Sequence, residues 1–360
     1  MKNKFSWLVV GAGPAGILAL ERLRMSSIPA SEIAWVDPDF AVGDLGTKWR
    51  NVPSNTKVKY FTKFLEEFEN KKISVLRATH ELFSLEPEAT CYLSHIADPL
   101  LTLSEDLQAQ VNTFQTKVSK VVYDAEYQTV QLENGETIFA KNIILAQGAE
   151  PRISALIDKS EISLAIVLDP KKLAINCDAD DVVAVFGSSH SAILALMNLV
   201  EATSVKKIIN IYRSPLKHAE YLDTGDILHD NTGLKGLASD WAKKNVELQH
   251  PRIIRALANS EEAKILLSQC TKVIYAIGFD TRNIDVQNVD LNNFDPATGI
   301  IAPGLFGLGI AYPALKKDVS GEIAKNVGLW KFALHLQFCF PLWLKGGDPS
   351  LSFQRRLESG

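Results

Sequence analysis

The sequence has few cysteines, and they form no short motif. There is no Cys-x-x-Cys pair, which argues against a zinc site, a disulfide framework and a vicinal redox pair. We therefore expect no metal ion and a reducing, cytoplasmic setting. The four cysteines lie far apart, at Cys91, Cys177, Cys270 and Cys339.

Strong net charge and long uninterrupted apolar runs are also missing. The formal net charge of -4 gives no general attraction to nucleic acid, so we expect no such partner. The most apolar stretch, residues 327–344, is broken by Lys331, His335 and Pro341. It predicts an amphipathic packing helix rather than a transmembrane span, and a homodimer or membrane-surface contact at this helix stays open.

What is present is a glycine-rich turn between an apolar strand and a helix. Residues 7–10 are apolar, residues 11–16 read Gly-Ala-Gly-Pro-Ala-Gly, and a helical pattern follows over 17–23. Such a turn lets a pyrophosphate approach the backbone, and the start of the helix offers it free N–H groups. The predicted contacts are Gly11, Gly13, Pro14, Ala15 and Gly16.

A second strand, residues 33–36, ends at Asp37, where a carboxylate binds the ribose of a dinucleotide. The glycine-containing segment that comes next, residues 42–56, predicts irregular backbone over a ligand, with Trp49 beside it. A surface loop with one buried tryptophan is the alternative for that segment.

The opening pattern recurs in the middle of the chain. Residues 182–186 predict a strand and 193–200 a helix, and the turn between them carries Gly187, Ser188, Ser189, His190 and Ser191. The repeat predicts a second dinucleotide-binding unit. Its next strand, 207–212, ends at Arg213, which suits the 2′-phosphate of NADPH, although an exposed arginine after a strand is the alternative.

Three further strand-to-glycine turns accompany the two units. They lie at residues 145–152, 275–282 and 306–313, and place Gly148, Gly278 and Gly309 close to the dinucleotides. A helix is predicted from about Ser320. The polar segment 214–264 matches no metal-binding spacing and is a candidate wall of a substrate site.

As a set, these motifs resemble the flavoproteins with two dinucleotide-binding domains, and among them the flavin-containing and N-hydroxylating monooxygenases. The resemblance covers most of the chain. It implies an α/β fold with two Rossmann-like domains, the NAD(P)H domain inserted into a discontinuous FAD domain. The implied boundaries are 1–170 and 283–360 for the FAD domain and 171–282 for the NAD(P)H domain.

By the same resemblance, the first glycine turn, Asp37 and Trp49 contact FAD, Gly309 lies near the flavin, and the second turn with Arg213 holds NADPH. The implied function is an NADPH-dependent FAD monooxygenase acting on a small nucleophilic substrate with O2. The residues identify no catalytic acid or base, because the cofactor carries the chemistry. Two alternatives stay open: a flavin reductase or oxidase passing electrons to a small acceptor or protein, and a catalytically silent flavin-binding regulatory protein.

Overall fold

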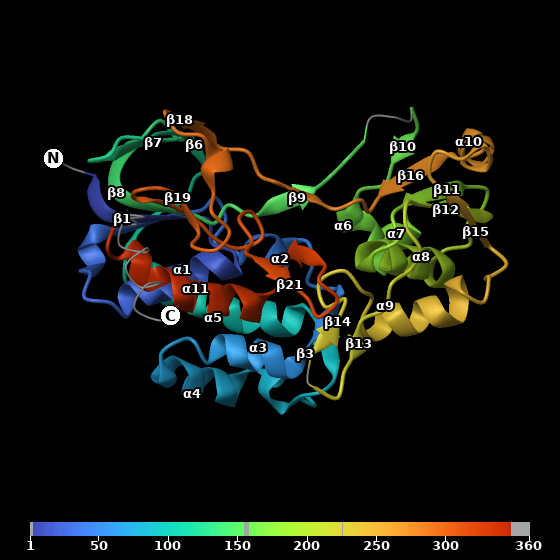
Figure 1. The fold of residues 1–360 in the computed structure, drawn as a ribbon, viewed down its shortest axis with the longest axis horizontal. Helices are drawn as coiled ribbons and strands as arrows, with labels where there is room; N and C mark the ends of the chain where they lie inside the picture. Colours follow the sequence, from blue (N-terminus) through green and yellow to red (C-terminus); the bar gives the residue numbers. More distant parts are fainter. Residues whose placement is uncertain (1–2, 155–157, 225, 347–360) are drawn as a thin grey trace.

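The chain folds into two lobes that lie side by side, each built on its own β-sheet (Figure 1). This computed structural model describes residues 3–154, 158–224 and 226–346. The first sheet contains strands from both ends of the chain, whereas the second contains strands from its middle. The second lobe is therefore inserted into the first.

The first sheet has the strand order β18-β6-β7-β8-β1-β2-β5, and β20 pairs with both β8 and β19. The β1, β2, β5, β8 and β20 strands pair in parallel, whereas β6–β7 and β7–β8 are antiparallel pairs. The strands are β1 (Lys4–Val10), β2 (Ile33–Val36), β5 (Asn112–Phe114), β6 (Val118–Val122), β7 (Gln128–Leu132), β8 (Thr137–Leu145), β18 (Asp285–Gln287), β19 (Ile300–Ala302) and β20 (Leu305–Gly307).

Helices from both ends of the chain cover one face of this sheet. One apolar core joins β1 residues such as Trp7 and Val9 to the five helices α1, α3, α4, α5 and α11, and Trp343 of the last helix stacks on Phe306 of β20. The helices of this lobe are α1 (Pro14–Arg24), α2 (Gly43–Thr47), α3 (Val58–Leu65), α4 (Asn70–Thr79), α5 (Ser94–Gln108) and α11 (Leu329–Trp343), with short 3-10 turns η1 (Ala30–Glu32), η2 (Glu81–Ser84) and η4 (Leu291–Asn293). No helix in the described part of the chain is long and apolar enough to cross a membrane.

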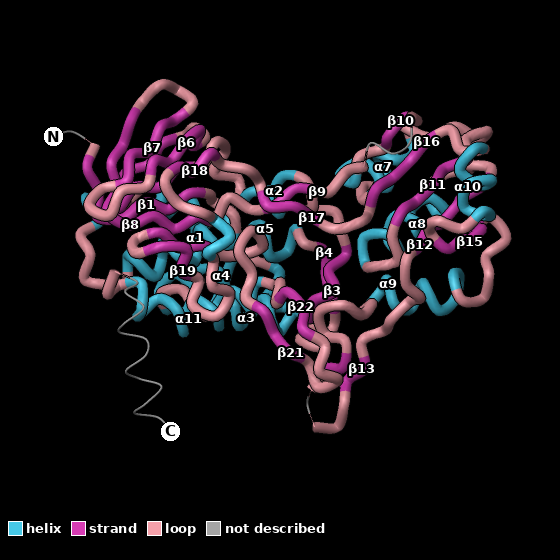
Figure 2. Tube along the Cα trace, turned by 45° about the horizontal axis from the view of Figure 1, so that its top comes forward, coloured by secondary structure: helices cyan, strands magenta, loops and turns pink. Residues whose placement is uncertain are grey.

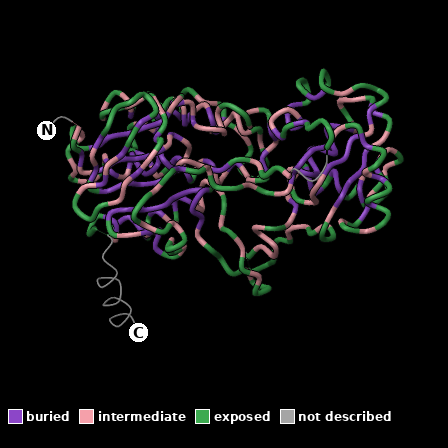
Figure 3. Tube along the Cα trace, turned by 90° about the horizontal axis from the view of Figure 1, so that it is seen from above, coloured by how far each residue is buried: buried purple, intermediate pink, exposed green. Residues whose placement is uncertain are grey.

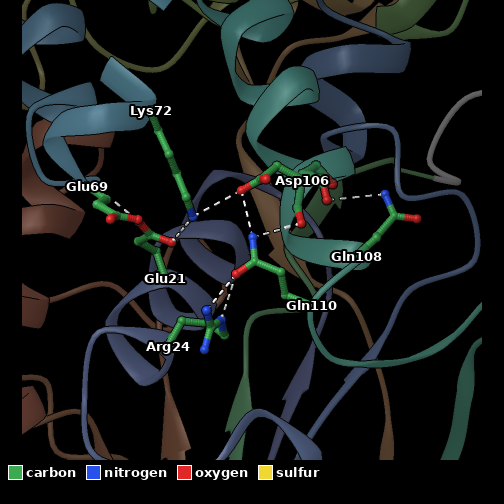
Figure 4. A network of polar contacts seen from close by, with 8 residues as sticks. Glu21, Arg24, Glu69, Lys72, Asp106, Gln108 and Gln110 are labelled. Carbon is green, nitrogen blue, oxygen red and sulfur yellow. Dashed lines mark hydrogen bonds and ion pairs between the residues drawn. The ribbon is translucent and has the colours of Figure 1, made fainter. Parts of the chain in front are cut away.

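A network of polar side chains ties α1, α4 and α5 together (Figure 4). Glu21 of α1 is fully buried, and its carboxylate accepts hydrogen bonds from the Lys72 ammonium at 2.7 Å and from the Glu69 N–H at 3.0 Å. Lys72 also pairs with Asp106 of α5 at 3.1 Å. The buried carboxylate is thus compensated by a lysine from a neighbouring helix.

The second sheet is parallel throughout, with the order β10-β16-β11-β12-β15. Because its central strands are covered on both faces, they are almost continuously apolar. The elements are β10 (Ser160–Glu161), α6 (Leu164–Val167), α7 (Pro170–Ala174), β11 (Val182–Phe186), α8 (His190–Ala202), β12 (Lys207–Tyr212), α9 (Gly236–Trp241), a π turn η3 (Ala242–Val246), β15 (Ile253–Leu257), α10 (Glu261–Ser268) and β16 (Lys272–Tyr275). The sheet includes β10, so the second lobe begins before the domain boundary that the sequence predicted at residue 170.

Two chain crossings join the lobes, and they run side by side. The outgoing β9 (Ala149–Pro151) pairs antiparallel with the returning β17 (Phe279–Thr281). Two more hydrogen bonds extend this pairing past the ends of the strands: the Arg152 N–H donates to Gly278 O and the Arg282 N–H donates to Gly148 O. Buried residues gather within each lobe on either side of this narrow connection (Figure 3).

Two hairpins approach each other between the lobes, below the crossing in Figure 2. One is β13 (Glu220–Tyr221) with β14 (Ile227–Leu228), and the other is β21 (Leu315–Lys317) with β22 (Ile323–Lys325). The helix predicted from about Ser320 is therefore wrong: this residue lies in the turn between β21 and β22, and α11 begins at Leu329. A third small pair, β3 (Pro53–Lys57) with β4 (Thr90–Tyr92), lies beside them.

Candidate functional site

The two glycine-rich turns have the same backbone geometry, which confirms the internal repeat. A Cβ on Gly11 would lie 2.4 Å from Ala146 O, and one on Gly187 would lie 2.3 Å from Ala276 O. Both glycines have positive φ, and each N–H donates at 2.8 Å to a carbonyl near the end of the next strand, that of Val36 or Ile211. Only glycine permits this close passage of two strand ends.

Gly16 and Gly13 have different roles in the first turn. A Cβ on Gly16 would lie 2.0 Å from Gly11 O, so this glycine allows α1 to pack on the turn. A Cβ on Gly13 would have no described atom within 4 Å, and Gly13 and Pro14 line a large cavity. The turn therefore leaves open space where the resemblance places a pyrophosphate.

This cavity of about 1010 Å³ lies between the lobes and is lined by both of them. The starts of α1 and α8 carry no side-chain cap, and both open onto it, through Gly13 and Pro14 and through His190 and Ser191. Uncapped helix starts leave N–H donors and a partial positive charge for phosphate groups. One space thus serves two sites suited to phosphate.

Asp37 is almost buried at the end of β2 and lines the cavity. Its carboxylate accepts hydrogen bonds from the N–H groups of Ala12 at 2.7 Å, Asp39 at 2.9 Å and Phe40 at 2.7 Å. A carboxylate has about four acceptor positions, so one remains for a ribose hydroxyl. Asp37 therefore shapes the turn and is also available to a ligand.

The turn after Asp37 is held in an unusual backbone conformation. Val42 is buried and β-branched yet has a φ of 63°, and Phe40 has a φ of 50°. Such values are costly for these residues and are maintained by the surrounding packing. They bring Gly43 against the first turn, where its Cβ would lie 3.3 Å from Gly13 Cα, and place Asp44 in the cavity wall.

Trp49 lies at the junction between the lobes rather than in a surface loop. It lines the cavity and packs edge-on against Phe279 of β17, with ring centroids 6.3 Å apart. Beside it, Arg282 pairs with Asp44 at 2.6 Å, so the returning strand is tied to the first lobe at the cavity wall.

His190 at the start of α8 reaches across the junction to Pro53 of the first lobe. Burial lowers its pKa, so the ring is neutral. Its Nδ1 is buried and has no hydrogen-bond partner among the described residues, although the residue lines the cavity. An imidazole nitrogen placed in this way is available to a ligand.

The predicted site residues fall into two groups. The structure brings together around the cavity Gly11, Gly13, Pro14, Asp37, Trp49, Gly148, His190 and Ser191. Those outside the lining are Ala15, Gly16, Gly187, Ser188, Ser189, Arg213, Gly278 and Gly309. In this second group Gly309 packs on the start of α1, where its Cβ would lie 2.7 Å from Ala15 Cβ, and Arg213 is an exposed residue directly after β12.

The sequence interpretation missed the residues that close the cavity opposite the crossing strands. Lys331 of α11 lies 2.7 Å from Asp230 and 2.6 Å from Asn231 of the second lobe. Asp230 also pairs with Lys235. No local pattern marks such a contact between distant segments. Arg282 could have been found, because Ala-x-Gly-x-x-x-Arg occurs at both 146–152 and 276–282.

Two clusters in the segment 214–264 resemble sites but have simpler explanations. His218 lies 2.7 Å from both Ser239 Oγ and Glu247 Oε1, but Ser239 is buried in α9 and outside the cavity lining. This set therefore anchors the loop to α9. His229 meets Asp318 and Glu322 of the β21–β22 hairpin, and both carboxylates already accept other hydrogen bonds.

The family assignment agrees with this geometry. The family model described as "Pyridine nucleotide-disulphide oxidoreductase" matches residues 5–293, and the chain belongs to this family. It is 31% identical to the monooxygenase AgnR1 of Paecilomyces divaricatus, over 95% of this chain and 98% of that protein. The protein is thus an NAD(P)H-dependent FAD oxidoreductase of the monooxygenase-like type.

Solved structures share the fold. A flavin-containing monooxygenase from Stenotrophomonas maltophilia matches with a TM-score of 0.64 at 13% identity, covering 95% of this chain and 99% of that one. The ornithine N-hydroxylase of Kutzneria sp. 744 matches with a TM-score of 0.61 at 13% identity, over 98% and 99% of the two chains. The predicted fold class and enzyme class are confirmed.

Proposed function

We propose that this protein reduces bound FAD with NADPH and uses O2 to oxygenate a small nucleophilic molecule. The observation that carries the proposal is the single cavity onto which the uncapped starts of α1 and α8 both open. Reduction of one dinucleotide by the other requires their reactive ends to meet, and one shared space allows it.

In this proposal FAD binds the first lobe, for which the sequence predicted residues 1–170 and 283–360. The open face of Gly13 and the start of α1, with Gly11, Pro14, Ala15 and Gly16, receive the pyrophosphate, and Asp37 accepts a ribose hydroxyl. Trp49, Gly148 and Gly309 border the path toward the flavin. The open Gly13, the spare acceptor position of Asp37 and the size of the cavity all suit this group.

NADPH binds residues 171–282 in the same proposal. Gly187, Ser188, Ser189 and Ser191 surround the start of α8, the free Nδ1 of His190 faces the dinucleotide, and Gly278 borders it. Arg213 receives the 2′-phosphate, because it follows the second strand of the unit and is exposed there. Its charge favours NADPH over NADH.

The cofactors supply hydride transfer and oxygen activation when bound. The chain supplies orientation and exclusion of water. Trp49 and Phe279 pack together at the junction of the lobes, and the Arg282–Asp44 ion pair fixes the returning strand beside the cavity. The Lys331–Asp230 contact closes the opposite side. Such enclosure protects an oxygen-derived oxidant from water before the substrate meets it.

The experiment that tests the proposal is single-turnover reduction followed by oxygen labelling. NADPH added without oxygen should bleach the visible flavin band, and labelled O2 should then place one labelled oxygen atom in a product formed from added nucleophiles. Bleaching without label in any product would indicate a reductase or oxidase. No bleaching would favour the silent regulatory protein.

A cytoplasmic location and a homodimer are also part of this proposal. The described cysteines are all free thiols, which suits a reducing cytoplasm. Phe338 is 65% exposed on α11, and a homodimer would cover this apolar side chain. Sedimentation of the wild-type protein and of Phe338→Glu tests the dimer, since a monomer in both would contradict it.

A further inference from the structure

Part of the cavity wall belongs to neither glycine-rich turn. It consists of α3, the β13–β14 hairpin, the β21–β22 hairpin and the first turns of α11, and we call it the outer chamber. Its apolar lining includes aromatic rings from both helices and suits a flat hydrophobic body. The apolar lining residues are Tyr60, Phe61, Tyr221, Ile227, Val319, Val327, Leu329, Trp330 and Leu334.

Most acidic groups of the outer chamber already have partners. Asp230 pairs with Lys235 and Lys331. Asp318 accepts hydrogen bonds from the Ser320 hydroxyl and from backbone N–H groups, and these bonds lower its pKa. Glu322 pairs with Lys217 and His229. Asp226 accepts a hydrogen bond from the Thr224 hydroxyl at 3.0 Å and is the remaining acid of this wall.

Three lysines of the same wall have no such partners. Lys316, Lys317 and Lys325 are exposed on the β21–β22 hairpin and line the cavity, and none has an ion pair within the described chain. Lys325 lies opposite Leu315 and therefore shares one face of the hairpin with Lys317, whereas Lys316, opposite Ala324, lies on the other face. The outer chamber therefore carries a surplus of positive charge beside apolar surface.

The positive charge of the hairpin also influences the pKa of Lys331 on α11. Burial lowers the pKa of Lys331, Asp230 raises it, and the charges of Lys235 and then of Lys316 lower it by smaller amounts. The phosphates of two dinucleotides are expected at the starts of α1 and α8, and neither start includes a residue of this hairpin. The three lysines are thus left for another anion.

We propose that the outer chamber binds a hydrophobic organic anion: an aromatic body packs on α3 and α11, and its carboxylate, sulfonate or phenolate lies against Lys317 and Lys325, with Lys316 adding positive charge from the other face of the hairpin. That this ligand is the substrate rests on the proposed monooxygenase function. The proposal that the anion binds in the outer chamber does not depend on that function.

Two fluorescent probes of the same aromatic body test the proposal. 1-Anilinonaphthalene-8-sulfonate carries a negative charge, and N-phenyl-1-naphthylamine is neutral. Both would be titrated into the FAD-loaded protein with saturating NADP+. We expect the anionic probe to bind about tenfold more tightly, a difference of roughly 1.4 kcal/mol, from two partly solvated charge contacts and the nearby charge of Lys316.

A triple variant and its matched control test whether the hairpin lysines cause the tighter binding of the anionic probe. Lys316→Gln, Lys317→Gln and Lys325→Gln together should weaken the anionic probe about tenfold and leave the neutral probe unchanged. The matched control replaces Lys71, Lys141 and Lys171 with glutamine. These lysines are also exposed but lie outside the cavity lining, so the affinity for both probes should stay unchanged. Flavin content and thermal midpoint show that each variant is folded.

Three results would overturn the inference: equal affinity for the two probes in the wild-type protein, an equal loss for both probes in the triple variant, or a loss of NADP+ affinity as large as that for the anionic probe. The last would assign the lysines to the dinucleotide. Because the readout needs no turnover, selective binding without any oxygenated product would contradict the monooxygenase proposal alone.

Discussion

Arg282 Nη2 lies 2.6 Å from Asp44 Oδ2, and this ion pair joins the strand that returns from the second lobe to the first turn of α2. Both residues line the cavity near Gly13. The arginine therefore has two effects: it neutralises a carboxylate beside the predicted pyrophosphate, and it holds the crossing strand in place.

Arg282→Gln should weaken FAD binding about tenfold, because Asp44 would then keep only the more exposed Lys48, at 3.2 Å, as a cationic partner and would repel the pyrophosphate, a loss of roughly 1.4 kcal/mol. Titration of apoprotein with FAD measures it. The double variant Asp44→Asn with Arg282→Gln should recover most of the affinity. Equal losses in the single and double variants would show that the repulsion is not the cause.

Gly13→Val should produce a folded protein without FAD. The glycine has a φ of -74°, which any residue adopts, and its Cβ would meet no described atom, so folding should be unaffected. The side chain would instead occupy the space expected for the pyrophosphate. We expect a thermal midpoint close to that of wild-type apoprotein and no retained flavin. A stable variant that stays yellow would contradict the assignment.

Arg213→Ala should raise the KM for NADPH by about tenfold or more and leave that for NADH almost unchanged, because only NADPH offers a second charged phosphate. Lys206→Ala provides the control, since this exposed lysine lies just before the opposite end of β12. Steady-state kinetics with both nucleotides measure the ratio. Parallel changes for the two nucleotides would remove Arg213 from the 2′-phosphate site.

Lys72→Met should destabilise the first lobe by about 3 kcal/mol, because it leaves the buried Glu21 carboxylate without its ammonium partner. Denaturant unfolding monitored by tryptophan fluorescence measures the loss. Adding Glu21→Gln to Lys72→Met should restore part of it, since the uncompensated charge is then removed. A larger loss in the double variant would mean that packing, rather than charge, dominates.

The sequence predicted those parts of the molecule that local patterns control. The strand–turn–helix units around Gly11 and Gly187 arise from glycines that must pass close to a neighbouring carbonyl, and the structure shows both passages.

Contacts between distant segments could not be predicted in the same way. Lys331 and Asp230 are far apart in the chain, and neither has a neighbour that signals the other. The β21–β22 hairpin also escaped prediction: its polar turn around Ser320 and its short strands lack the alternation of a buried sheet, and the apolar residues downstream of it favoured an early helix start.

The insertion of the second lobe into the first has a consequence for synthesis of the chain. The inserted lobe is contiguous, so its last strand, β16, is complete at Tyr275. The first sheet still lacks β18, β19 and β20 at that point, and it gains β20 only at Gly307. Since domains fold as units while the chain emerges, the lobe in the middle of the sequence should reach its native structure before the lobe that begins it.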